Sequence, residues 1–210
     1  MKKKIDKFFS VSWADKKMIL RKEFLMPILR KKFGHIGNGS CIEKALAIRG
    51  EKYMFIGDNT FIRPRARIEC VTEFAGKQYK PQLKIGNNVN IEQNLYMTCA
   101  ELIEICDNTT ISSNVLITDI NHSYKRLNVS PLLQELETRR VRIGSYTLIG
   151  AGAKIMPGVS IGQNVVVGAN AVVTKSIPDY SIAAGVPAKV IKRYDFEKNA
   201  WISVIEKEFL

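Results

Sequence analysis

The chain has 210 residues, of which 46% are hydrophobic, and its formal net charge is +12. This length allows one domain with a full core, and the apolar fraction excludes a wholly disordered chain. The charge gathers at the start, because residues 1–33 hold eleven lysines and arginines against three acidic residues, a net +8. The remainder is only mildly basic and carries no nucleic-acid-binding motif, so we expect no nucleic-acid partner.

Residues 6–33 mix apolar side chains with these cations and predict a helix with a kink near Pro27. We therefore assign residues 1–35 to a basic helical cap. Two interpretations of residues 1–33 stay open: their cations face water, or the segment rests on an anionic membrane surface. No signal peptide follows residues 1–4, so we expect a cytoplasmic protein, and in the second interpretation one at the inner face of the membrane.

Residues 36–192 carry a repeat of six, in which an aliphatic residue recurs and a small residue usually follows it. A period of six fits neither an α-helix nor a hairpin sheet. It fits a short strand and a turn, repeated so that three hexads close a triangular coil. We therefore predict an all-β solenoid, a parallel β-helix of about six coils. The repeated positions are Ile36, Ile42, Ile48, Ile56, Ile62, Ile68, Ile85, Ile91, Met97, Ile105, Ile111, Ile117, Ile143, Ile149, Ile155, Ile161, Val167 and Val173.

Two segments interrupt the hexads, at about residues 70–84 and about residues 120–141. We expect both to protrude as loops, and loops on a rigid scaffold often carry function. Apolar residues at roughly helical spacing predict a C-terminal helix over residues 193–210. Four cysteines without a CxxC pair and only two histidines give no support to a metal site, so none is expected.

The second interruption contains His122, the candidate catalytic residue. An imidazole has an unperturbed pKa of about 6.5 and accepts protons at neutral pH. A lone histidine also fits a structural role, so the residue alone does not decide. Nearby Asp119 has two interpretations: it orients His122 and sets its tautomer, or it caps a turn.

Three runs resemble the hexapeptide-repeat acyltransferases, in the branch of galactoside, maltose and capsule or lipopolysaccharide O-acetyltransferases. They are VRIGSYTLIGAGAKIMPGVSIG (residues 141–162), VVTKSIP (172–178) and AAGVPAKVI (183–191). The resemblance implies left-handed coiling, acetyl-CoA as donor, and a homotrimer with active sites between subunits. It also implies that His122, at the family spacing after the Ile105 hexad, is the general base for the acceptor hydroxyl. A backbone N–H near the Gly150–Ala151 turn would hold the oxyanion.

The same resemblance suggests where the donor binds. The pantetheine arm would follow the corners at Gly150, Ala151 and Ala169, with Thr174 and Lys175 at the coenzyme A end. Lys189 and Lys192 are the candidates for its phosphates.

The acceptor site departs from the galactoside and maltose pattern. Leu148 stands where galactoside relatives carry tryptophan, so an aromatic wall would come from Tyr124 or Tyr146. Glu92 replaces the acceptor-binding asparagine, with Asn94 two residues on. An amino sugar, a sialic acid or another surface-glycan residue stays open as acceptor.

The predicted function is O-acetylation of a sugar hydroxyl in a surface polysaccharide. The alternatives are N-acetylation of an amino sugar, a nucleotide sugar or an antibiotic, and a scaffold without activity.

Overall fold

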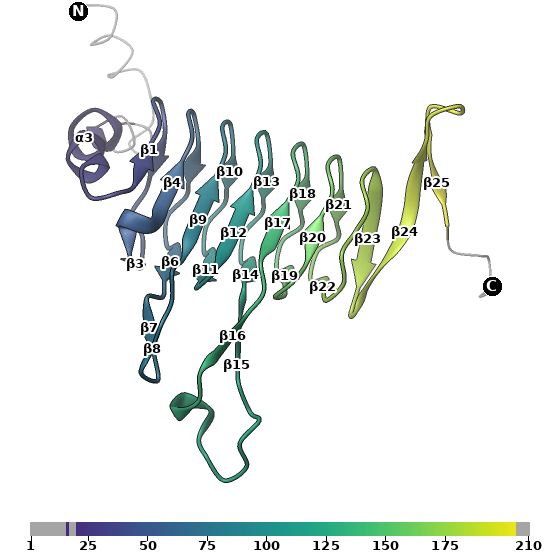
Figure 1. Ribbon diagram of the computed structural model, residues 1–210. Helices are drawn as coiled ribbons and strands as arrows, with labels where there is room; N and C mark the ends of the chain where they lie inside the picture. Colours follow the sequence, from purple (N-terminus) through teal and green to yellow (C-terminus); the bar gives the residue numbers. More distant parts are fainter. Residues whose placement is uncertain (1–15, 17–19, 205–210) are drawn as a thin grey trace, which may run out of the picture.

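The computed structural model describes residue 16 and residues 20–204, and its body is a three-sided prism (Figure 1). The first face contains β1 (His35–Ile36), β4 (Met54–Ile56), β9 (Gln82–Ile85), β12 (Leu102–Ile105), β17 (Val141–Ile143) and β20 (Ser160–Ile161). The second face begins with β2 (Cys41–Ile42), β5 (Phe61–Ile62), β10 (Asn90–Ile91), β13 (Thr110–Ile111), β18 (Leu148–Ile149) and β21 (Val166–Val167). The third face contains β3 (Ala47–Arg49), β6 (Arg67–Cys70), β11 (Tyr96–Cys99), β14 (Leu116–Thr118), β19 (Lys154–Ile155) and β22 (Val172–Val173).

The chain passes the three faces in turn, so each coil supplies one parallel strand to each face. The prediction of an all-β solenoid with about six coils is therefore confirmed. The repeated aliphatic residues point inward and stack in register: Ile56 pairs with Ile36 on one side and with Ile85 on the other. All of the repeated positions are buried except Ile48, which packs partly buried against the same core. The residues that recur every six positions are therefore those whose side chains face the core.

The corners between faces explain why a small residue follows many of the repeated aliphatic residues. An added Cβ at Gly150 would lie 2.6 Å from the backbone nitrogen of Ala169 on the next coil. Other corners use asparagines in the left-handed backbone region, such as Asn88 (φ 54°) and Asn108 (φ 57°). Their side chains are linked by a 3.2 Å hydrogen bond from Asn88 Nδ2 to Asn108 Oδ1. The close stacking of consecutive coils therefore explains why glycine and asparagine occupy these corners.

A short helical segment covers the N-terminal end of the prism. The π-helix η1 (Arg21–Leu25) leads into α3 (Met26–Arg30), which buries Met26 and carries Pro27 in its first turn. Arg30 Nη2 donates a 2.9 Å hydrogen bond to the carbonyl of Gly37 on the first coil. The predicted helical character is confirmed for these residues, while most of residues 1–19 lie outside the described part of the chain.

The C-terminal helix predicted for residues 193–210 is wrong for residues 193–204. After β23 (Ser181–Gly185), strands β24 (Ala188–Asp195) and β25 (Ala200–Ser203) extend the second face in antiparallel fashion. The ring of Tyr194 contacts that of Trp201 at 5.3 Å across this hairpin. The edge of β23 offers ladder hydrogen bonds and the aromatic side chains pack across strands, which outweighs a helical spacing of a few apolar residues. Residues 205–210 lie outside the described part.

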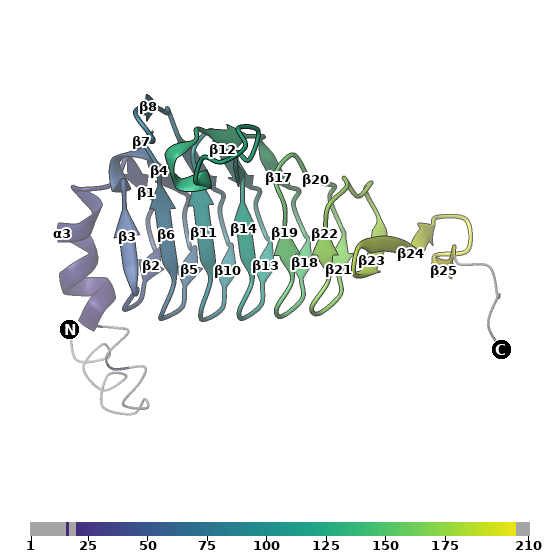
Figure 2. The ribbon, with the colours of Figure 1, turned by 90° about the horizontal axis from the view of Figure 1, so that it is seen from below.

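Both predicted interruptions protrude from one side of the prism (Figures 1 and 2). The first forms a hairpin of β7 (Glu73–Phe74) and β8 (Lys77–Gln78). The second forms a ribbon of β15 (Ile120–His122) and β16 (Leu136–Thr138), joined by a loop that contains the 3-10 helix η3 (Pro131–Leu133). A further 3-10 turn, η2 (Glu51–Tyr53), precedes β4.

Candidate active site

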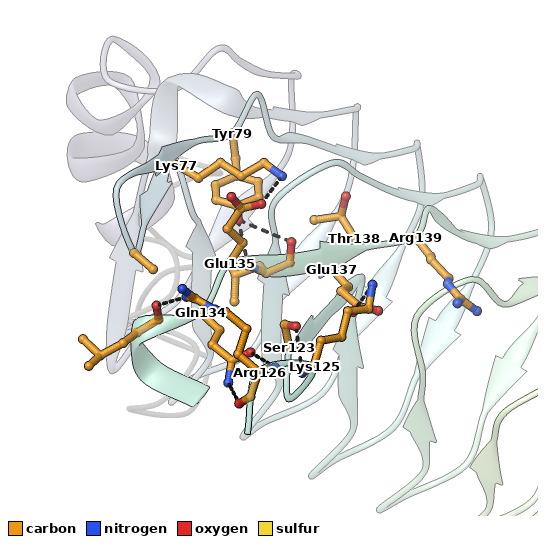
Figure 3. A pocket seen from close by; sticks show the side chains of 13 residues that line it. Lys77, Tyr79, Ser123, Lys125, Arg126, Gln134, Glu135, Glu137, Thr138 and Arg139 are labelled. Atoms are coloured by element: carbon orange, nitrogen blue, oxygen red, sulfur yellow. Dashed lines mark hydrogen bonds and ion pairs between the residues drawn. The ribbon is translucent and has the colours of Figure 1, made fainter. Parts of the chain in front are cut away.

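His122 ends β15 and lies opposite Leu136 of β16. Side chains alternate along a strand, so Ile120 and His122 project from one side of the ribbon and Ser123 from the other. Ile120 and His122 line a groove of about 440 Å³ that runs over the third face. Ser123 lines a separate cavity of about 780 Å³ between the ribbon and the β7–β8 hairpin (Figure 3).

The floor of the groove consists of outward-facing side chains of the third face. In β6, Ile68 points into the core, whereas its neighbour Glu69 points outward and lines the groove. Strand pairing places Glu69 beside Thr98, and Thr98 beside Thr118. This polar row runs parallel to a second row in which Arg67, Tyr96 and Leu116 are in register. The groove therefore combines a hydrogen-bonding row with a row that contains one aromatic ring, that of Tyr96.

The imidazole of His122 is exposed and meets the ring of Phe74 edge-on, with centroids 5.2 Å apart and planes at 65°. Within the described residues, neither ring nitrogen makes a hydrogen bond. Phe74 belongs to the β7–β8 hairpin, so the two interruptions meet at this histidine. A free imidazole nitrogen at the end of a groove can accept a proton from a bound hydroxyl or amine.

Asp119 is fully buried and holds the turn between β11 and β12. Its Oδ1 accepts a 2.8 Å hydrogen bond from the N–H of Ala100, and its Oδ2 accepts bonds of 2.8 Å from Glu101 and Leu102. Burial raises the pKa of Asp119 from its ordinary value, although these N–H donors oppose the shift. Of the two predicted roles, its contacts in the described chain fit the turn cap and include none to His122.

The predicted donor residues lie along both edges of the third face. Gly150 and Ala151 form a corner between the second and third faces, and Ala169 stacks directly on Gly150 in the next coil. Thr174 follows β22 on the opposite edge, together with Lys175, and both side chains are exposed. The ribbon that carries His122 leaves from this second edge. A single chain thus brings together parts of the predicted donor site, but not all of it.

The two remaining donor candidates, Lys189 and Lys192, lie on β24 with exposed side chains. They are opposite Ala184 and Ile182 of β23, beyond the last coil.

The predicted acceptor residues are spread over the molecule. Glu92 follows β10 and accepts a 2.9 Å hydrogen bond from Asn90, at the corner where Asn94 adopts a φ of 62°. Asn94 is occupied by hydrogen bonds with Arg65 and Asn114, as expected of a corner residue. Neither lies among the residues that line the groove.

The two candidate aromatic walls also lie outside the groove. Tyr124 is 81% exposed on the loop beyond His122. Tyr146 occupies the corner between β17 and β18, where the first and second faces meet, and is 62% exposed. That corner is opposite the third face, so one chain does not bring Tyr146 to His122.

The cavity of Figure 3 shows how the hairpin holds the ribbon. Lys77 of β8 forms a 2.7 Å ion pair with Glu135. The hydroxyl of Tyr79 accepts a 2.7 Å hydrogen bond from the N–H of Leu136, the residue opposite His122. These contacts hold the ribbon on the side that faces away from the groove. They thereby position His122 at the end of the groove.

Sequence reasoning identified His122 but missed the groove residues Glu69, Tyr96 and Phe74. Glu69 and Tyr96 occupy outward positions of β6 and β11 that the repeat does not constrain, and Phe74 lies within the first interruption. Among the described residues, no cluster of three or more His, Cys, Asp or Glu side chains is arranged to hold a metal ion. In the same part of the chain, no helix is long and apolar enough to cross a membrane.

Comparison with known proteins agrees with this architecture. The profile of the bacterial transferase hexapeptide family (six repeats) matches residues 140–175. WbbJ of Escherichia coli (strain K12), named as a provisional lipopolysaccharide biosynthesis O-acetyl transferase, is 40% identical over 123 residues. That alignment covers 55% of this chain and 63% of WbbJ, a little under two thirds of that relative. The galactoside O-acetyltransferase of the same strain is 31% identical over 165 residues, 78% of this chain and 75% of the enzyme.

A solved structure of similar shape is that of a mutant of AntD, an N-acyltransferase from Bacillus cereus, in complex with dTDP and coenzyme A. It superposes with a TM-score of 0.68 and 25% identity, covering 82% of this chain and 90% of AntD. The chain therefore belongs to the hexapeptide-repeat acyltransferase family. The structural relatives are left-handed β-helices, which confirms the predicted hand.

Proposed function

We propose that the protein is an acetyl-CoA-dependent O-acetyltransferase that acts on a sugar hydroxyl of a surface polysaccharide. The observation that carries the proposal is the imidazole of His122 at the end of the third-face groove, which makes no hydrogen bond with the described part of the chain, in a protein of this family. The names of WbbJ and the galactoside enzyme support O-acetylation, and the former supports a surface glycan.

In the proposed reaction, His122 takes the proton of the acceptor hydroxyl while its oxygen attacks the thioester carbon of acetyl-CoA. The resulting oxyanion needs a hydrogen-bond donor. The N–H of Gly150 already donates to Val167, so we assign this role to the N–H of Ala151, which makes no hydrogen bond within the described residues. Collapse expels the thiolate, which recovers the proton from the imidazolium. Holding both substrates in one cleft supplies much of the remaining rate.

We further propose that three copies assemble with their active sites between neighbouring subunits. The support is the division of the predicted donor residues between two edges of the third face. The Gly150 corner of one copy could then face the His122 edge of another, which would complete the donor site. Light scattering should give a molar mass three times that of the 23.7 kDa chain, and a monomer or dimer would contradict this assembly.

N-acyl transfer to an amino sugar or a nucleotide sugar is the second candidate. It is favoured by the similarity to AntD, an N-acyltransferase whose structure holds dTDP. The same imidazole would accept a proton from the amine, so the groove alone does not separate the two reactions.

Release of free thiol from acetyl-CoA tests the proposal, with a panel of glycans, amino sugars and nucleotide sugars as acceptors. We expect acceptor-dependent release that falls by about a hundredfold or more in His122→Ala, the usual range for loss of a general base. His35→Ala is the matched control, because it removes the other histidine, which lies on β1 outside the groove. Release that is independent of acceptor, or equal in both variants, would refute the assignment.

We also propose that the N-terminal segment contacts an anionic membrane surface. The support is a second apolar side of this segment: Phe24 is 71% and Ile28 is 61% exposed, while Met26 is buried against the prism. A helix that is apolar on both sides is normally covered on both. The net charge of +8 in residues 1–33 would attract acidic lipid head groups.

A further inference from the structure

Glu69 is a buried acid in the floor of the groove that contains His122. The residue is only 9% exposed, although it stands on the outer side of β6. Its Oε2 accepts a 2.8 Å hydrogen bond from Arg67 Nη2. Its Oε1 faces Arg49 Nη1 at 3.3 Å, yet within the described residues no donor forms a hydrogen bond to this oxygen. The Arg49 ion pair offsets the charge of this oxygen, but its capacity to accept a hydrogen bond is unused among the described residues, which leaves room for a donor.

The surroundings of this oxygen have the character of a sugar-binding surface. Thr98 and Thr118 continue the polar row from Glu69 along the floor, with their hydroxyl oxygens 2.8 Å apart. Tyr96 borders this row under the guanidinium of Arg67, which lies 5.0 Å from the ring centroid. A sugar ring has apolar C–H faces that pack on aromatic rings, and hydroxyl edges that hydrogen-bond. The groove offers both kinds of partner, and His122 lines the same groove.

We propose that Glu69 determines acceptor specificity: its Oε1 accepts a hydrogen bond from one hydroxyl or amino group of the acceptor sugar while another group of that sugar reaches His122. This inference rests on the proposed function and names the acceptor class for the same site. Binding satisfies the buried oxygen, and it orients the ring along the row that Thr98 and Thr118 continue.

Because Oε1 is a hydrogen-bond acceptor, it limits which group of the sugar substrate can bind beside it. A carboxylate oxygen recognises a hydrogen-bond donor, so the sugar presents a hydroxyl or an ammonium group at this point. A carboxylate of the sugar cannot take this place, because it and Oε1 are both hydrogen-bond acceptors; the two arginines beside Glu69, Arg49 and Arg67, leave this part of the groove with a net positive charge. The partner of Oε1 itself is therefore a hydroxyl or an ammonium group.

Glu69→Gln tests this role with little change of shape. The amide oxygen stays with Arg67, so the amide N–H₂ replaces Oε1 and presents donors where an acceptor is needed. We expect the acceptor KM to rise by about tenfold to a hundredfold, as for loss of a hydrogen bond to a charged group, with the KM for acetyl-CoA unchanged within about twofold. Glu104→Gln is the matched control, since Glu104 also pairs with an arginine (Arg142, 3.1 Å) but on the first face.

A set of deoxy analogues of the acceptor separates recognition from indirect damage. For the wild-type enzyme, one analogue should lose at least about tenfold in kcat/KM, because a site built to bind a hydroxyl rejects its absence. In Glu69→Gln the same analogue should lose no more than about twofold relative to the full sugar. Equal losses in both enzymes would overturn the inference. A wild-type enzyme that transfers no acetyl group at all would instead remove the proposed function beneath it.

Discussion

At the scale of the residue, a substitution at Asp119 distinguishes a side chain that holds a turn from one that orients a catalytic base. Asp119→Asn replaces one of two accepting oxygens by an amide N–H₂, which then faces a backbone N–H of the Ala100–Leu102 turn. A buried donor left unsatisfied costs about 1–3 kcal/mol, so we expect the melting temperature to fall by about 3–10 °C. Turnover of the folded variant at low temperature should fall by less than tenfold, measured by thiol release. A larger loss without a stability change would restore the orienting role.

The residues of the site differ in how far the sequence could predict them. His122 became a candidate because its spacing from Ile105 matches the family; the imidazole alone fits a structural role equally well. Glu69 and Tyr96 could not be found in this way. The repeat constrains inward positions alone, and the outward neighbours become a surface only when register across coils is known. That register depends on the length of each interruption, because residues in the loops do not contribute to the coils.

At the scale of the element, the corner glycines set the distance between coils. Gly150→Ala places a methyl group 2.6 Å from the backbone of the next coil, at Ala169 and Val167, so the coils must separate there. Overpacking of this kind costs about 1–3 kcal/mol, and thermal unfolding should move down by several degrees.

Gly76→Ala is the control for backbone strain alone. Gly76 has a φ of 78° in the β7–β8 hairpin, and an added Cβ would meet no atom within 4 Å. Its effect should be smaller than that of Gly150→Ala. Gly150 has no positive φ, so equal shifts in melting temperature would mean that the close approach at Gly150 costs no more than left-handed strain in an open hairpin.

The elements also show where periodicity succeeds and fails as a predictor. The hexads predicted the coils because eighteen repeats agree and each buries one aliphatic side chain. The segment after residue 192 held only a few apolar residues, whose helical spacing arose by coincidence across the β24–β25 turn. Its strands are specified by a tertiary contact instead, the open edge of β23. The secondary structure of a segment with so short a pattern is determined by its tertiary contacts.

At the scale of the whole molecule, different elements adjoin the two ends of the prism. At the C-terminal end, β24 and β25 extend the second face beyond the last coil. At the N-terminal end, the helical segment of η1 and α3 lies over the first coil (Figure 2), and Phe24 of η1 and Ile28 of α3 are exposed. The groove and both protruding loops lie between these ends. Contact with a membrane through the N-terminal segment would leave the His122 groove open to a surface glycan precursor.

Sedimentation with vesicles tests this arrangement on the full-length protein. We expect binding to vesicles that contain acidic lipids and little binding to neutral ones. Raised salt should weaken the binding because it screens the cations of residues 1–33. The double variant Phe24→Ser/Ile28→Ser should pellet less than the wild type, since it removes the apolar contribution but keeps the charge.

Leu127→Ser is the matched control for loss of an exposed apolar side chain. Leu127 is 85% exposed on the loop between β15 and β16, far along the chain from the N-terminal segment. It should pellet as the wild type does. If the double variant also pelleted like the wild type, the apolar side of the helix would not contact lipid. Binding through charge alone would then place the helix at the bilayer surface without insertion, and the exposed Phe24 and Ile28 would have to be covered by another protein surface.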